Sequence, residues 1–146
     1  MVRTIDFDSP AVQSYLTILQ SVIARMAANS ASAKTWCVAL VSAIVVVVAD
    51  KGEPRLVWIG LLPVLLLGLL DAYYLGLERL FRDRYNEFIA KLHDDRATAE
   101  DVFLVSLGAG MKGTTTSAFK ALSSVSVWPF YGVLTVMLVI VRLWVL

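Results

Sequence analysis

The sequence has few of the residues that build disulfides and metal sites. Its 146 residues include one cysteine, Cys37, and one histidine, His93. A single cysteine excludes an intramolecular disulfide and a zinc site made from several cysteines. A single histidine excludes a site built on a histidine pair. No nucleophile and base stand in a catalytic pattern, so we expect no metal, no cofactor and no enzyme activity.

Charged residues are also scarce. They make up 17% of the chain, against about 25% in soluble domains. The 13 basic and 12 acidic residues nearly cancel, so the charge predicts no nucleic-acid partner. Apolar residues make up 58%, and the mean hydropathy is +0.73. A chain this short cannot bury that much apolar surface in its own core. The composition therefore points to the lipid bilayer as a partner.

The apolar residues are concentrated in three runs. These runs predict an all-α integral membrane protein with three transmembrane helices, at residues 33–49, 56–75 and 127–146. A spanning helix needs about 20 mainly apolar residues, which the third run supplies directly and the first two reach with their flanks. The alternative is a soluble domain with buried helices. A chain of this size has nowhere to bury three helices that are apolar on every face.

Basic residues predict the orientation of the spans. Seven of the 13 lie within residues 76–126, whereas residues 50–55 contain only Lys51 and Arg55. Because positive residues stay on the cytoplasmic side, we expect a cytoplasmic N-terminus, an external turn at 50–55 and an external C-terminus. The membrane expected is the bacterial inner membrane. Residues 76–126 would then form a cytoplasmic helical extension, a loop and an interfacial helix.

The helical pattern continues beyond the first two spans. Ser9 and Pro10 are typical of a helix start. Apolar residues then recur at steps of three and four over residues 12–26, and again over 77–92. Residues 1–32 are therefore predicted to contain a cytoplasmic amphipathic helix. Together the patterns predict two long helices, about 10–49 and 56–93, that pair as a hairpin extending into the cytoplasm.

Small residues recur on both helices of the predicted hairpin. Such residues let membrane helices approach closely. A tight turn at 50–55 pairs Thr35 with Ala72 and Ala39 with Gly68. The predicted helix-packing residues are Thr35, Ala39 and Ala43 on the first helix and Gly68, Ala72 and Gly76 on the second.

The same register brings the acidic residue Asp71 close to Lys34. We interpret this predicted intramembrane polar pair as structural. The alternative is an ion or proton site, because a carboxylate within a span is often functional. Pro63 lies in the second apolar run and is a possible hinge, although it could equally be an ordinary kink.

A glycine-rich stretch interrupts the predicted cytoplasmic segment. Gly108, Gly110 and Gly113 match the spacing G-x-G-x-x-G, with Lys112 inside it. A dinucleotide fingerprint must follow a strand, and no strand pattern precedes these residues. We therefore read the stretch as a flexible loop. The alternative is contact with a phosphate or a lipid head group through Lys112 and the amides of Gly110 and Gly113.

Four short segments carry a resemblance to known proteins. Residues 29–37, 49–51, 70–74 and 126–132 resemble parts of a family of short bacterial multi-pass membrane proteins. That family has no established activity that the resemblance could imply for this chain. In size and layout the chain is also similar to membrane effectors of bacterial anti-phage systems, which a cytosolic partner triggers. This similarity is one of build and not of motif.

Three functions are expected from these observations. The first is a small membrane effector or pore subunit, with anti-phage defence as a possible role. It would be a homo-oligomer, because three spans cannot enclose a channel alone. The second is a membrane anchor or scaffold whose cytoplasmic hairpin recruits a protein partner. The third is an ion- or proton-coupled subunit that uses Asp71.

Overall fold

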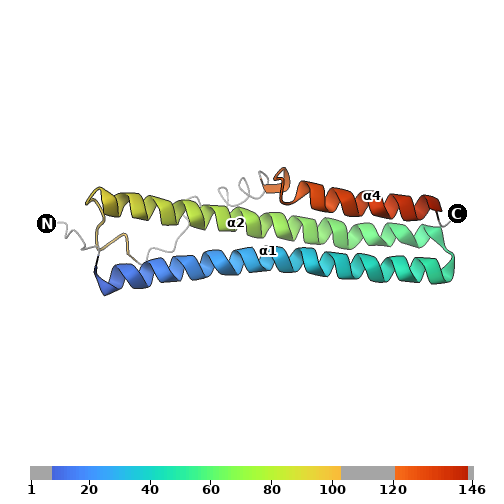
Figure 1. Ribbon diagram of the computed structural model, residues 1–146, viewed down its shortest axis with the longest axis horizontal. Coiled ribbons are helices and arrows are strands. Elements are labelled where there is room, and N and C mark those ends of the chain that lie inside the picture. Colours follow the sequence, from blue (N-terminus) through green and yellow to red (C-terminus); the bar gives the residue numbers. More distant parts are fainter. Residues whose placement is uncertain (1–7, 103–120, 145–146) are drawn as a thin grey trace.

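The computed structural model describes residues 8–102 and 121–144, and every element in them is helical. Helix α1 spans Pro10–Lys51, the 3-10 helix η1 spans Pro54–Gly60, α2 spans Leu61–His93 and α4 spans Trp128–Trp144. Helices α1 and α2 lie side by side as a long antiparallel hairpin (Figure 1). The predictions of an all-helical chain and of two long paired helices are confirmed for these residues.

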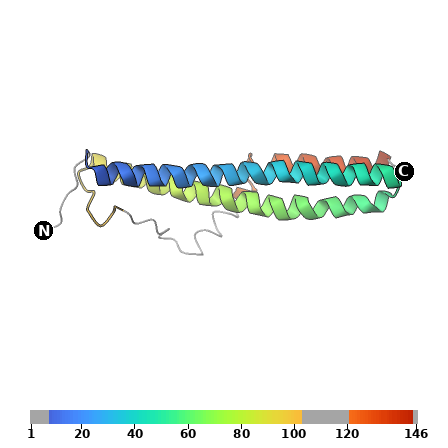
Figure 2. The same cartoon turned by 90° about the horizontal axis from the view of Figure 1, so that it is seen from below.

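The third helix covers only part of the hairpin. In both views α4 lies along the half of the hairpin that contains the turn, and it ends near that turn (Figures 1 and 2). Gly60 permits this approach, since a Cβ atom there would lie 2.9 Å from the side chain of Leu138 in α4. The hairpin therefore has a three-helix half beside the turn. In the described residues, its other half consists of α1 and α2 alone.

Helix α1 runs for 42 residues because nothing in its sequence interrupts it. No glycine or proline occurs between Pro10 and Gly52, and Ser9 occupies the N-cap position, as the sequence predicts. One stripe of buried residues follows the helix at steps of three, four and seven, the spacing of coiled-coil packing. Its members are Val12, Tyr15, Leu19, Met26, Ser30, Ala33, Cys37, Val41 and Val48.

The hairpin turn is tighter than the six-residue turn predicted at 50–55. Helix α1 continues to Lys51, and only Gly52 and Glu53 separate it from η1. Gly52 has φ 62°, and its N–H donates to the carbonyl of Val48 at 3.0 Å. This left-handed cap suits glycine, and Pro54 then starts the 3-10 helix with its fixed φ. The second helix therefore begins as η1 and becomes α-helical only at Leu61.

Two separate apolar clusters hold the hairpin together. One lies beside the turn and joins α1, η1, α2 and α4. The other lies at the far end, where Tyr15 and Leu19 of α1 pack with Phe88 and Leu92 of α2. The Tyr15 and Phe88 rings meet edge to face with centroids 4.9 Å apart. Burial raises the pKa of the Tyr15 hydroxyl. Each half of the hairpin thus has its own core.

The chain folds back on α2 after His93, where α2 ends as predicted. The Asp101 carboxylate accepts hydrogen bonds from the N–H and hydroxyl of Thr98, at 3.1 and 2.9 Å. It also pairs with the Lys91 ammonium at 2.9 Å, and this contact lowers the pKa of Asp101. Residues 99–102 form turns, and residues 103–120 of the predicted extension lie outside the described residues.

Exposed apolar side chains are confined to one half of the molecule. All the large exposed hydrophobic residues except Ile18 lie within 36–73 or 125–144. By length and composition, two helical segments can cross a membrane: α1 and the continuous segment 54–93. Helix α4 is apolar but shorter, with 17 residues. We call the half that holds α4 the apolar half, because it exposes these large apolar side chains. The other half of the hairpin is the polar half.

We expect Leu19→Ala to loosen the polar half while the apolar half stays intact. Leu19 is fully buried, and such truncations cost about 2–5 kcal/mol. Hydrogen exchange should quicken in residues 10–25 and 82–93 and stay unchanged in 37–49. Ile18→Ala is the matched control, because Ile18 is 39% exposed. Equal effects of the two variants would contradict the separate cores.

Candidate functional site

A charged residue is buried where the three helices meet. Asp71 of α2 is 0% exposed, and it is the one charged residue in the described part of the chain that is classed with the buried core. Small neighbours make this burial possible. Gly68, Ala72 and Gly76 are all buried on the same helix, so that other helices can approach its backbone closely.

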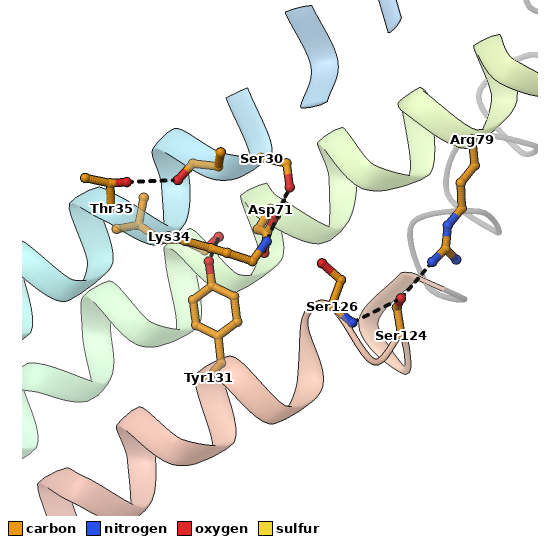
Figure 3. Close-up of polar contacts among 10 residues, drawn as sticks. Ser30, Lys34, Thr35, Asp71, Arg79, Ser124, Ser126 and Tyr131 are labelled. Carbon is orange, nitrogen blue, oxygen red and sulfur yellow. Dashed lines mark hydrogen bonds and ion pairs between the residues drawn. The ribbon is translucent and has the colours of Figure 1, made fainter. Parts of the chain in front are cut away.

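Helix α1 supplies the partners of Asp71. The Lys34 Nζ lies 2.5 Å from Asp71 Oδ2, and the Ser30 hydroxyl donates to Asp71 Oδ1 (Figure 3). The Lys34 ammonium also donates to Ser30 Oγ at 3.3 Å. Ser30 and Lys34 are one helical turn apart, and this spacing places both on the face that meets α2. The structure thus brings together the two residues of the predicted intramembrane polar pair.

Helix α4 closes the site with Tyr131. Its ring extends toward the Asp71 cluster, and its hydroxyl donates to the carbonyl of Leu67 at 3.2 Å (Figure 3). The ring passes close to Gly68, where a Cβ atom would lie 3.5 Å from it. The cluster is therefore shared by all three helices, and Tyr131 covers it from the side of α4.

This arrangement balances the charge of Asp71 inside one chain. Each carboxylate oxygen has a polar neighbour on α1, and Lys34 is only 21% exposed. Removing one partner of such a pair leaves an uncompensated buried charge. No group of three or more potential metal ligands occurs in residues 8–102 and 121–144. The geometry supports the structural interpretation of Asp71 more than the ion or proton site.

The predicted small-residue face is corrected on α1. Thr35, Ala39 and Ala43 are exposed, although their predicted partners on α2 are buried. The continuous stripe through the polar half sets the rotation of α1, so that Ala33, Cys37 and Val41 face inward instead. On α2, Gly68 accommodates the Tyr131 ring of α4, not a small residue of α1.

The other predicted site residues lie apart from this cluster. Pro63 is the third residue of α2, in a first turn that tolerates its missing N–H, and not in the middle of an α-helix. Its role as a hinge stays a prediction. Gly110, Lys112 and Gly113 fall outside the described residues.

Three contributors to the place where α1, α2 and α4 meet were not predicted from the sequence. The role of Ser30 could have been predicted from the sequence, because Ser30 lies one helical turn before Lys34. The role of Tyr131 could not, because nothing in the sequence fixes the register of α4 against α2. The third is a contact between Arg79 and Ser124, whose Nη2 and Oγ atoms are 2.7 Å apart. The Ser124 carbonyl accepts the N–H groups of Val127 and Trp128, so this contact ties the start of α4 to α2.

Comparisons with known proteins provide no family for this arrangement. No protein-family model, no curated protein and no solved structure matches the chain. The resemblance to short bacterial multi-pass proteins stays a prediction. The placement and chemistry of individual residues are therefore what indicates the function.

The ion pair predicts unequal effects of its two single substitutions. Lys34→Met leaves the fully buried Asp71 carboxylate without a cation, and we expect a stability loss on the order of 3 kcal/mol. Asp71→Asn should cost less, because the partly exposed Lys34 can turn toward water. The double variant should recover most of the loss. Unfolding of the purified proteins in mixed micelles measures all three.

A matched control for this cycle is Lys51→Met, which removes an exposed cation at the C-terminal end of α1. It should leave stability nearly unchanged. If Lys34→Met behaves like this control, the ion pair does not hold the helices together.

Proposed function

We propose that the protein is an inner-membrane anchor whose rigid helical arm binds a protein partner in the cytoplasm. The observation that supports this is the unbroken passage of α1 from an apolar half into a polar half. At about 1.5 Å per residue, α1 is about 63 Å long, twice the roughly 30 Å of a hydrocarbon core. Half of the hairpin therefore stands outside the bilayer.

Exposed aromatic residues support this placement. Trp36, Tyr73 and Trp128 are exposed at the end of the apolar half nearest the polar half, and Trp58 and Trp144 are exposed toward the other end. Tryptophan and tyrosine favour the two interfaces of a membrane. The 17 residues from Trp128 to Trp144 cover about 26 Å of helix, which suits a span. We take the turn at Gly52 as external and the arm as cytoplasmic.

The polar half offers a surface for a partner. A groove of about 540 Å³ lies between the two helices there, lined by Gln20, Ile23, Ala27, Arg82 and Tyr85 among others. The Gln20 side chain donates to the Tyr85 hydroxyl across it at 3.1 Å. Amide, phenol and guanidinium groups beside short apolar side chains suit recognition of a protein segment.

The alternative of a pore-forming effector, including one in anti-phage defence, receives less support. A conducting pore needs polar groups along its lining. In the apolar half of the described chain, Asp71, Lys34 and Ser30 are engaged with one another, and Ser42 is the one polar residue among the exposed residues of 36–49, 56–70 and 128–144. Subunits would therefore have to line a pore with hydrophobic residues.

Membrane topology gives the first test. In a Cys37→Ala background we expect Glu53→Cys to react with a membrane-impermeant thiol reagent in intact cells, because Glu53 lies in the exposed turn. Ser14→Cys, exposed on the arm, should react only after permeabilisation. Labelling of both sites in intact cells, or of Ser14→Cys alone, would contradict the orientation.

Partner binding gives the second test. A photo-crosslinking amino acid at Ala27, which lines the groove of the polar half, should form an adduct with a cytoplasmic protein. Adding Arg82→Glu should lower the yield of this adduct, because the substitution reverses a charge in the groove. The matched control position is Asp83, which is exposed and does not line the groove. Absence of the adduct, together with ion flux through vesicles containing the pure protein, would favour the pore instead.

A further inference from the structure

An open apolar groove lies between α2 and α4 in the apolar half. Its volume is about 240 Å³, and Val64, Leu65 and Leu69 form its α2 side, with Trp128 and Gly132 on the side of α4. Leu65, Leu69 and Trp128 are exposed, so that the groove opens to the outside of the helix bundle. A Cβ atom added to Gly132 would meet nothing within 4 Å, which shows how much room the groove leaves.

At the cytoplasmic end of this groove lies a cation, Arg79, that has no acidic partner among the residues the structure describes. Leu122 lines the groove, and Ser124, two residues later, accepts a hydrogen bond from the exposed Arg79 (Figure 3). Within the described residues, Arg79 has no carboxylate within 4 Å. The other basic residues of α2 differ, since Arg82, Arg84 and Lys91 each pair with an acid.

The apolar groove and the Arg79 guanidinium together suit the binding of a phospholipid. A guanidinium has five N–H donors suited to phosphate oxygens, and the contact of Arg79 with Ser124 uses one of its nitrogens. The groove beside it accepts a hydrocarbon chain. The exposed Trp128 lines the groove four residues after Ser124, and aromatic residues are common at the level of lipid head groups.

We infer that this site binds one anionic phospholipid, with its phosphate on Arg79 and Ser124 and an acyl chain in the groove between α2 and α4. The inference rests on the proposed placement of this half in the bilayer. An anionic head group is favoured over a zwitterionic one because Arg79 presents a positive charge that forms no ion pair within 4 Å among the described residues. The lipid would bridge α2 and α4 at the cytoplasmic interface.

The site is tested by native mass spectrometry of the full chain with phosphatidylglycerol or phosphatidylcholine of identical acyl chains. Wild-type protein should retain phosphatidylglycerol preferentially. Arg79→Gln should reduce that preference about tenfold, the effect of losing one charge-assisted hydrogen bond. Arg84→Gln is the matched control, because Arg84 pairs with Glu87 and does not line the groove, and it should keep the preference.

A second variant tests the acyl-chain part of the site. Gly132→Leu fills the groove without meeting other atoms at its Cβ and favours the helix, so it should lower retention of both lipids. Val133→Leu, exposed on α4 and outside the groove, should lower neither.

The outcomes separate this inference from the proposed function. Protein that stays in membranes through alkaline extraction but shows no lipid preference, or responds equally to Arg79→Gln and Arg84→Gln, overturns the lipid site and leaves the anchor standing. Release of the protein by alkaline extraction overturns both. Unchanged lipid retention by Gly132→Leu overturns the groove as the acyl-chain site.

Discussion

The close and continuous packing of α1 against α2 is the constraint on which the rest of the structure depends. One buried stripe runs the length of α1, and the small residues Gly68, Ala72 and Gly76 keep the facing backbone accessible. Because the stripe continues through both halves, it fixes the rotation of α1 everywhere. That rotation turns Ser30 and Lys34 toward Asp71, and it leaves Thr35, Ala39 and Ala43 outside.

The buried ion pair between Lys34 and Asp71 depends on this packing. A carboxylate in an apolar environment is costly unless it is paired and hydrogen-bonded. Here Lys34 provides the opposite charge, Ser30 provides a hydrogen bond, and Tyr131 covers the cluster. Any other rotation of α1 would leave Asp71 without these groups. The pair therefore favours one register of the hairpin as well as stabilising it.

Helix α4 divides the molecule into two parts with different surroundings. It covers the half of the hairpin beside the turn, where most of the exposed large hydrophobic side chains lie (Figure 1). Within the described residues, the other half is a pair of helices with a polar surface. The proposed anchor and the proposed lipid site both follow from this division. The arm is the part without α4, and the groove exists because α4 packs on α2 with glycines on both sides.

The sequence by itself determined the helical class, the start of α1 at Pro10, the end of α2 at His93 and the pairing of Lys34 with Asp71. These follow from local signals: hydrophobic period, caps and distance from the turn. The inward face of α1, the glycine turn with its 3-10 helix, and the contacts of Tyr131 and Arg79 with other helices were decided only by the tertiary structure. The reason is physical: these features depend on how helices rotate and slide against one another, which the packing of all their side chains sets together.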